Sequence, residues 1–255
     1  MKVTILCNDM ARPGLFSEHG LSLLIDDETI FDTGMTDVAV KNADKLGADL
    51  SRVKRIFISH GHYDHIGGLP YMLAGTGKID LYLHKKALVP KYSGDRFAGF
   101  SYQWKDIEKM AKVHLLEGNA IIDGFTILND VPTIEENIDP NFKVNGHHDL
   151  FEDEINLIKD GVLITGCAHR GIENIFAKAG TVQMVIGGFH LLNSSIERIN
   201  EISKIFKTAG VKVVPLHCTG KTATEILKET LSDKCLIKMA GDTIYIGGWR
   251  VAGSV

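Results

Sequence analysis

Four side chains that can bind metal ions lie within six residues of one another, at His60, His62, Asp64 and His65. They directly follow the mostly apolar run RIFIS at 55–59. An apolar, β-branched run that ends in turn-forming residues is typical of a buried strand entering a loop. Neutral imidazole suits zinc or iron and a carboxylate adds negative charge, so four such ligands can hold two metal ions. The alternative is a solvated polar loop, which does not require this spacing.

The stretch HGHYDHIGGL around these ligands resembles the metal-binding signature of the metallo-β-lactamase superfamily. Three later stretches resemble one subgroup, the dihydropterinyl-methyl-ribofuranosylaminobenzene 5′-phosphate synthases of methanopterin-type cofactor biosynthesis and their bacterial relatives. These stretches are TGCAHRGIENI at 165–175, VIGGFHLL at 185–192 and VPLHCTGKTA at 214–223. The resemblance covers nearly the whole chain. It implies an α/β (α+β) fold, an αββα sandwich of two mixed sheets with helices on the outer faces and the site at one edge.

The resemblance also implies a site for two divalent metal ions, each with three protein ligands. A two-metal site can lower the pKa of a bound water and clamp both oxygens of a phosphoryl or carbonyl displacement. Zinc is the expected metal, and iron or manganese is the alternative, because sites of histidine and aspartate accept all three. By motif position, the ligands are His60, His62 and His169 for one ion, and Asp64, His65 and His217 for the other.

The stretch TGCAH departs from the pattern of many superfamily members, in which a glycine–aspartate pair supplies a carboxylate that bridges the metals. Cys167 stands where that aspartate would be, with no acidic residue next to it. Either Cys167, His169 or His190 fills the gap, or one ion binds weakly, so the number of ions stays open. Losing the carboxylate removes negative charge from between two cations. The departure casts doubt on plain hydrolysis and favours the reaction of the subgroup.

Three residues are predicted to take part in catalysis, namely Asp32, Asp64 and His190. Asp32 closes an apolar strand in the pattern DTG, and by resemblance it holds the free N–H of a ligand histidine. A turn-forming DTG is the alternative. His190 follows two Gly residues and precedes a predicted helix. The Gly residues let the backbone approach another group, and we expect His190 to be a ligand or a substrate-facing acid or base, with a core histidine as the alternative. Glu18 and His19 match the subgroup's EHG pattern, which places them near the mouth of the site.

Two predicted helix starts offer N–H groups and cations to an anion, as a phosphate-bearing substrate would require. Arg170 begins one of them, and Thr219 and Lys221 begin the other. Ordinary helix starts with a solvated lysine are the alternative. The GKT at the second start is not a nucleotide-binding loop, because Pro215 stands where that motif needs its first glycine.

Residues 90–105 are rich in aromatic side chains, which argues for an ordered loop rather than disorder. Trp104 could stack on a flat ring there, and Arg96 could meet a phosphate. A hydrophobic cluster that packs the loop onto the domain is an equally good interpretation. Farther along, His147 and His148 lie in a polar stretch, where a solvated loop is favoured over a third metal site.

The whole chain, residues 1–255, is expected to form a single domain of two similar halves with a loop insertion at about 84–150. The expected strands are 2–7, 20–26, 29–34, 53–58, 79–83, 113–116, 120–128, a hairpin over 154–166, 181–188, 211–220, 235–238 and 242–246. The expected helices are 36–49 with a threonine cap, 171–180, 194–210 with a serine cap and a terminal glycine, and 221–231.

Composition excludes several classes of protein. The net charge of −4 offers no basic face for nucleic acid. No apolar run reaches the roughly 18 residues of a membrane helix, and the N-terminus lacks the apolar core of a signal peptide. We therefore expect a cytoplasmic protein. Its four cysteines form no CxxC motif, so neither a zinc knuckle nor a disulfide framework is indicated.

Three functions remain open at this point. The first is a metal-dependent transferase that joins a pterinylmethyl diphosphate to a ribofuranosylaminobenzene phosphate, as the resemblance implies. The second is a metal-dependent hydrolase, a phosphodiesterase or other ester hydrolase. The third is a non-catalytic metal- or ligand-binding protein. In the first two cases the partner is a small, phosphorylated substrate, and the oligomeric state is undetermined.

Overall fold

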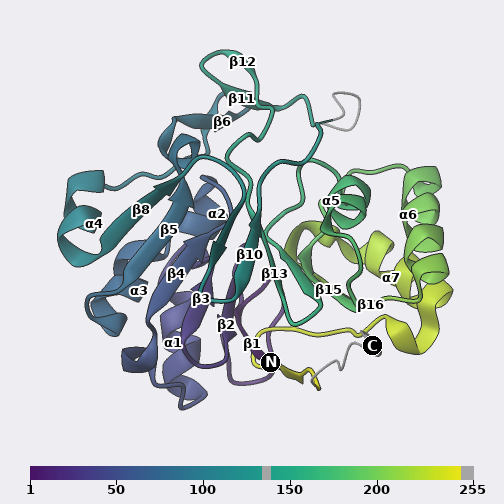
Figure 1. The fold of residues 1–255 in the computed structure, drawn as a ribbon, viewed down its shortest axis with the longest axis horizontal. Helices are drawn as coiled ribbons and strands as arrows, with labels where there is room; N and C mark the ends of the chain where they lie inside the picture. Colours follow the sequence, from purple (N-terminus) through teal and green to yellow (C-terminus); the bar gives the residue numbers. More distant parts are fainter. Residues whose placement is uncertain (134–138, 248–255) are drawn as a thin grey trace, which may run out of the picture.

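Two mixed β-sheets pack face to face in the computed structural model, which describes residues 1–133 and 139–247 (Figure 1). The first sheet has the strand order β17-β1-β2-β3-β4-β5-β8, and the second has the order β16-β15-β14-β13-β10-β9. Buried side chains of both sheets fill the space between them, such as Val3 and Phe57 from the first and Leu157 and Ile186 from the second. The predicted αββα sandwich is therefore confirmed.

In the first sheet, β3, β4, β5 and β8 run parallel, so their carboxyl ends meet at one edge. Asp32 directly follows β3, and the metal-loop histidines follow β4. The strands β17, β1, β2 and β3 pair antiparallel. The bounds are β1 Lys2–Cys7, β2 Ser22–Ile25, β3 Thr29–Phe31, β4 Arg55–Ile58, β5 Asp80–His84, β8 Lys112–Leu116 and β17 Thr243–Tyr245.

In the second sheet, β14, β15 and β16 run parallel and deliver the later candidate ligands at their carboxyl ends. The predicted hairpin is present as β13 and β14, and its turn residues Asp160 and Gly161 both have positive φ, as a tight hairpin turn favours. The bounds are β9 Ala120–Ile122, β10 Phe125–Leu128, β13 Asn156–Lys159, β14 Val162–Thr165, β15 Met184–Gly188 and β16 Lys212–Leu216.

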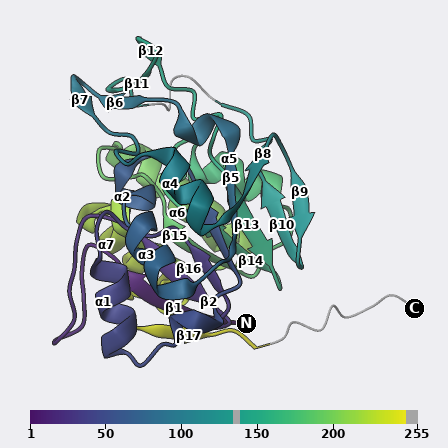
Figure 2. The same cartoon turned by 90° about the vertical axis from the view of Figure 1, so that its left-hand side faces the viewer.

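Helices cover the outer face of each sheet, as Figures 1 and 2 show from two sides. The first sheet carries α1, α3 and α4, and the second carries α5, α6 and α7. Within the described residues, no helix is both long and apolar enough to cross a membrane. The bounds are α1 Val38–Lys45, α2 Tyr63–Ile66, α3 Leu69–Thr76, α4 Trp104–Met110, α5 Ile172–Ala179, α6 Ile196–Ala209 and α7 Lys221–Leu231, with the short 3₁₀ helices η1 Leu50–Arg52, η2 Lys85–Leu88, η4 His217–Thr219 and η5 Ser232–Lys234.

The predicted ends of the elements are partly confirmed. Ser195 caps α6 by accepting a bond from the Arg198 N–H, and the left-handed Gly210 ends it. The threonine cap of α1 is wrong, because the helix begins at Val38 with Asp37 at the cap position, and the Thr36 hydroxyl donates to Glu18. The strand expected at 235–238 is also wrong, since only a single bridge pairs that segment with β16.

The segment expected as an insertion, 84–150, is divided between three sheets. Its strands β8, β9 and β10 belong to the two large sheets. Four further strands form a small antiparallel sheet, in the order β12-β11-β6-β7, that lies at the top of Figure 1. The bounds are β6 Lys91–Ser93, β7 Arg96–Phe97, β11 Phe142–Val144 and β12 His147–His148. The exposure of both histidines of β12 agrees with a solvated segment, and the single-domain organisation stays a prediction.

A buried lysine ties the small sheet to the metal loop. The Lys91 ammonium donates to Asp149 Oδ2 at 2.7 Å and to Asp153 Oδ1 at 2.9 Å, and the other oxygen of Asp153 accepts the Gly61 N–H at 2.8 Å. Burial opposes the charge on Lys91, but the carboxylates of Asp153 and Asp149 outweigh it and raise the pKa of the lysine. The small sheet and the loop between His60 and His62 are therefore held in one arrangement.

Replacing Lys91 by Met should destabilise the protein by about 3–5 kcal/mol, because two carboxylates would remain buried without their cation. Lys86→Met is the matched control, since Lys86 pairs with Glu152 at the surface and its loss should cost at most about 1 kcal/mol. The measurement is the free energy of unfolding in urea. Equal effects of the two substitutions would contradict the role of Lys91.

Candidate metal centre

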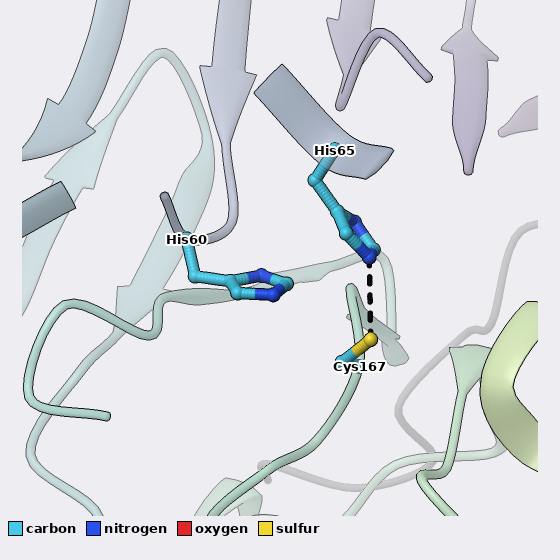
Figure 3. A group of neighbouring side chains, drawn as sticks. All are labelled: His60, His65 and Cys167. Carbon is cyan, nitrogen blue, oxygen red and sulfur yellow. Dashed lines mark hydrogen bonds between the residues drawn. The ribbon is translucent and has the colours of Figure 1, made fainter. Parts of the chain in front are cut away.

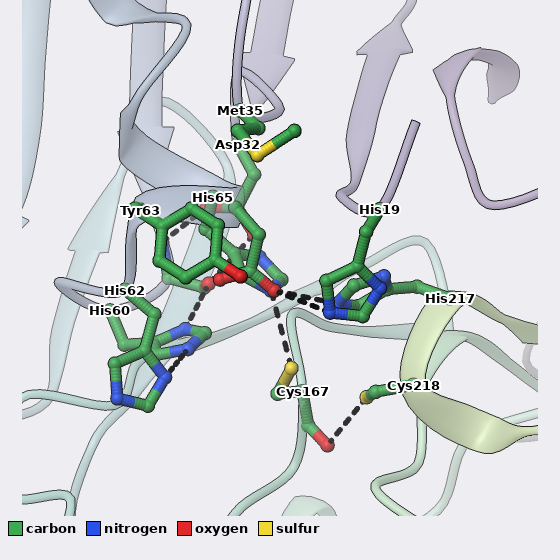
Figure 4. Close-up of polar contacts among 12 residues, drawn as sticks. His19, Asp32, Met35, His60, His62, Tyr63, His65, Cys167, His217 and Cys218 are labelled. Carbon is green, nitrogen blue, oxygen red and sulfur yellow. Dashed lines mark hydrogen bonds and ion pairs between the residues drawn. The ribbon is translucent and has the colours of Figure 1, made fainter. Parts of the chain in front are cut away.

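The carboxyl ends of the parallel strands of both sheets meet at one edge of the sandwich, and candidate ligands gather there (Figure 4). Four non-glycine residues near this edge, Asp32, Ala168, His190 and His217, have positive φ values of 58°, 58°, 48° and 45°. Such conformations are costly and persist where the surrounding structure determines them, which is common at functional sites.

Close packing of the backbone brings the two strand ends together. A Cβ on Gly166 would clash with Ser59 Oγ, so only glycine lets the end of β14 lie against the end of β4. A Cβ on Gly188 would lie 2.6 Å from Cys218 Sγ. The close backbone approach predicted from the glycines before His190 is thus present.

The first group of ligand atoms comes from three buried histidines. His60 Nε2 lies 3.0 Å from His62 Nδ1 and 3.2 Å from His169 Nε2. In a tetrahedral zinc site with Zn–N bonds of about 2.0–2.1 Å, ligand nitrogens lie about 3.3–3.4 Å apart. The three nitrogens predicted for the first ion therefore have a spacing that fits a metal ion.

The protonation of these rings also fits metal binding. Burial lowers the pKa of His62 to about 3 and lowers those of His60 and His169 well below the ordinary value. The rings are therefore neutral, which is the form that binds metals. His60 Nδ1 lies 2.9 Å from Ser59 Oγ, whose hydroxyl donates to Asp32, so the His60 ring donates through Nδ1 and keeps the Nε2 lone pair free.

The second group of ligand atoms surrounds one carboxylate oxygen, Asp64 Oδ2. His217 Nε2 lies 3.1 Å from it, and His65 Nε2 lies 3.7 Å from it. Burial opposes protonation of His217, but Cys218 and the carboxylates of Asp64 and Asp9 outweigh it and raise its pKa. The negative charge around His217 Nε2 thus favours a cation there, either a proton or a metal ion.

Asp32 lies where the sequence predicted it to support a ligand. Its carboxylate is fully buried and accepts the Ser59 N–H at 2.7 Å, the Ser59 hydroxyl at 2.7 Å and His65 Nδ1 at 2.7 Å. Because the N–H of His65 is used in this way, its Nε2 is free to bind a metal. This hydrogen bonding supports a positioning role and not a turn-forming DTG alone.

Cys167 lies between the two groups of ligand atoms. Its sulfur is 3.2 Å from His65 Nε2, and the ligand atoms of His60, His65 and Cys167 all lie within 4.8 Å of one another (Figure 3). Burial raises the pKa of the Cys167 thiol well above its ordinary value. The thiol therefore stays protonated unless a metal ion stabilises the thiolate. That Cys167 fills the place of the missing carboxylate stays a prediction.

A cleft of about 1120 Å³ opens onto these side chains, with the small sheet forming one wall and α6 another. His62, Asp64, His169, His190 and His217 line it. The His190 ring lies 4.2 Å from the His169 ring, and its buried Nδ1 has no hydrogen-bond partner within the described part of the chain.

Of the residues predicted to bind substrate, the structure places Arg96 on the cleft. Its guanidinium donates to the Tyr63 hydroxyl at 2.8 Å and lies 5.3 Å from the centre of the Tyr63 ring. The ring of Phe142, which sequence reasoning did not single out, lies opposite on the cleft, 4.8 Å from the His62 ring. One arginine without a carboxylate partner among the described residues and two aromatic rings thus border the candidate ligands.

The other four predicted substrate residues do not line the cleft. Arg170 is buried and donates to the carbonyls of Asn129 and Val131. The Thr219 hydroxyl donates to the Leu216 carbonyl and accepts the Phe189 N–H. Lys221 is exposed beside Glu225, and Trp104 packs against Phe100 on the helix-covered face of the first sheet. That these four bind substrate stays a prediction without a supporting contact.

Sequence reasoning missed two acidic residues beside the ligands, Asp9 and Glu154. Glu154 accepts the N–H of His169 at 2.7 Å, and its burial raises the pKa of this carboxyl to about 7. Asp9 accepts from His217 Nδ1 at 2.7 Å. Neither belongs to a recognisable motif, and Asp9 lies 208 positions from His217, so spacing alone could not reveal these contacts.

The family model of the metallo-β-lactamase superfamily matches residues 19–207. The chain belongs to this superfamily. Its members are in general metal-dependent enzymes, and the fold implies binding of divalent metal. The clustered histidines are consistent with that expectation.

Three individual proteins are similar to this chain over most of its length. The chain is 33% identical to the uncharacterized protein MJ0448 of Methanocaldococcus jannaschii, over 89% of this chain and 94% of that protein. It is 29% identical to the 7,8-dihydropterin-6-methyl-4-(beta-D-ribofuranosyl)-aminobenzene-5′-phosphate synthase of the same organism, over 91% of this chain and 92% of that protein. The structure also superposes on the crystal structure of Tm1679, which is described as a metal-dependent hydrolase of the β-lactamase superfamily. The TM-score is 0.87 at 40% sequence identity, and the match covers 96% of this chain and 99% of that chain. The resemblance seen in the sequence is confirmed.

Replacing Asp32 by Asn should weaken metal binding by about 10–100-fold, because one oxygen becomes an NH2 donor and the side chain can no longer accept from His65 and from both donors of Ser59. Asp80→Asn is the matched control, since Asp80 pairs with His114 at 2.6 Å and neither lines the cleft. Affinity is measured by competition with a chromophoric chelator, and thermal unfolding of the metal-free variants checks the fold. Equal affinities for the two variants would contradict the positioning role of Asp32.

Proposed function

We propose that this protein is a metal-dependent enzyme that acts on a small, phosphate-containing substrate. The observation that carries the proposal is the meeting of two groups of ligand atoms at the floor of one cleft that also presents an arginine. Divalent ions bound there would supply charge stabilisation and activation of oxygen at a phosphoryl centre. Zinc is the metal that best suits these ligands, and iron or manganese is the alternative.

The residues are given the following roles in this proposal. The first ion is held by three histidines and the second by one carboxylate and two histidines, with the thiol of Cys167 between them. Asp32 fixes the orientation of His65, and His190 holds or moves a proton at the wall of the cleft. The ligands are His60, His62 and His169 for the first ion, and Asp64, His65 and His217 for the second.

Arg96 is proposed to bind the phosphate, and the aromatic rings beside it are proposed to hold a flat part of the substrate. The Arg96 guanidinium has no carboxylate partner within the described residues, and it is fixed over Tyr63. Tyr63 and Phe142, rather than Trp104, border the cleft and can stack on a ring. A cleft of about 1120 Å³ is large enough for a substrate of several rings.

The reaction favoured is a synthase-like transfer in which a diphosphate leaves a pterinylmethyl group. Support comes from the 29% identity to the aminobenzene-5′-phosphate synthase over nearly the full length of both chains. The replacement of a bridging carboxylate by Cys167 also distinguishes this site from the hydrolase pattern described above. The alternative is a metal-dependent hydrolase of phosphodiesters or other esters, supported by the description of Tm1679. A non-catalytic ligand-binding protein is the third possibility, and a cytoplasmic location remains a prediction.

Two assays on zinc-loaded protein test the proposal. One measures release of pyrophosphate from a pterinylmethyl diphosphate in the presence of a ribofuranosylaminobenzene phosphate, and the other measures hydrolysis of a bis-aryl phosphodiester. We expect pyrophosphate release that needs both substrates, that falls to background in a His60→Ala, His62→Ala variant, and that shows a raised KM in Arg96→Gln.

His114→Ala is the control, because His114 lies on β8 away from the cleft and should leave both assays unchanged. Rapid phosphodiester hydrolysis without pyrophosphate release would favour the hydrolase. Metal-independent turnover, or turnover that survives the double variant, would contradict the proposal.

A further inference from the structure

One carboxylate holds two imidazole rings beside the second group of ligand atoms. Asp9 Oδ1 lies 2.7 Å from His217 Nδ1, and Asp9 Oδ2 lies 3.0 Å from His19 Nδ1. The centres of the two rings are 4.6 Å apart. Since a carboxylate only accepts hydrogen bonds, each ring donates to Asp9 through Nδ1. A neutral ring held in this way carries its free lone pair on Nε2.

Both Nε2 atoms approach the same oxygen. Asp64 Oδ2 lies 3.1 Å from His217 Nε2 and 3.4 Å from His19 Nε2, and Figure 4 shows the His19 and His217 rings side by side. A carboxylate oxygen and two bare imidazole nitrogens repel one another unless a cation lies among them. The buried Nε2 of His217 makes no well-aligned hydrogen bond in the described part of the chain, although it lies within ion-pair distance of Asp64 Oδ2, so a cation held between the two atoms would satisfy both.

The loop that carries His19 is anchored on both sides. The Leu21 N–H donates to the Asp64 carbonyl at 3.3 Å, and a Cβ on Gly20 would lie only 2.6 Å from that same carbonyl oxygen. On the other side, the Glu18 carboxylate accepts the N–H groups of Met35 and Thr36 at 2.9 and 3.1 Å. His19 is thus placed against Asp64 by fixed backbone, although its own side chain is about half exposed on the cleft.

We propose that His19 is a further ligand of the second metal ion and that Asp9 is the carboxylate that positions His19 and His217 as a pair. This inference rests on the proposed function. It gives the second ion four protein ligands, Asp64, His65, His217 and His19, whereas the first ion has three histidines.

The two ions then differ in their expected chemistry. Four protein ligands close a zinc site, whereas three leave a position for water or substrate. The second ion would mainly fix charge and hold an oxygen of the substrate weakly. The first ion, which lies beside His190 and the small sheet, would be the one with an open position towards the cleft.

Zinc titration of the full-length protein, in competition with a chromophoric chelator, tests this assignment. The wild type should bind two equivalents. His19→Ala should weaken the second equivalent by at least about 10-fold and leave the first unchanged, because only the second ion loses a ligand. Asp9→Asn should also weaken the second equivalent selectively, since it releases both rings. His114→Ala is the matched control, because that histidine also pairs with one aspartate but lies off the cleft.

The outcomes separate this inference from the proposed function. If the wild type binds two equivalents and His19→Ala binds both as tightly as His114→Ala does, His19 is not a ligand and the proposed function stands. If the wild type binds fewer than two equivalents, both the inference and the two-ion site are overturned. If thermal unfolding shows that His19→Ala is misfolded, His19→Gln replaces it. A dissociation constant for the second zinc equivalent that equals the wild-type value in that folded variant overturns the inference.

Discussion

The buried carboxylate of Asp32 is the contact on which the arrangement of this site depends. It is fully shielded from solvent and holds one ligand ring directly, that of His65, and a second through the Ser59 hydroxyl, that of His60. The two rings belong to different groups of ligand atoms, so a single acceptor sets the orientation of both. A buried carboxylate is costly unless its oxygens are used, and here both oxygens accept bonds.

The direction of the parallel strands places the other candidate ligands. Successive parallel strands bring their carboxyl ends to one edge, and the two sheets place their edges together. Gly166 permits the close contact between these edges, because a larger residue would meet Ser59. The small sheet is then fixed over the edge by Lys91, whose ammonium group connects it through Asp153 to the backbone at Gly61. The two sheet edges thus fix each other's position, and they in turn fix the position of the small sheet.

Much of the fold and the clustering of the candidate ligands could be predicted because their signals are local. The apolar run that ends at His60, the DTG at Asp32 and the glycines before His190 each combine a strand end with a polar group, and the structure places all of them at one edge. The helix caps were less predictable, as Thr36 shows, because the helix begins only at Val38 and the Thr36 hydroxyl donates to Glu18, a distant residue that no local pattern reveals.

The contacts that escaped prediction join residues that lie far apart in sequence. Asp9 meets His217 across more than 200 positions, and no periodicity signals such a pair. Arg170 illustrates the opposite error, since a cation at a helix start resembles a phosphate site, yet its guanidinium is used by the carbonyls of Asn129 and Val131. The side chains bordering the cleft depend on how the small sheet folds over the edge, which composition alone does not reveal.

The central claim is that this edge holds two metal ions with different ligand sets. Anomalous diffraction at the zinc absorption edge, from crystals of the zinc-loaded protein, tests it most directly. The account predicts two peaks, one among His60, His62 and His169 and one beside Asp64 and His217. A single peak, or peaks away from these side chains, would contradict it.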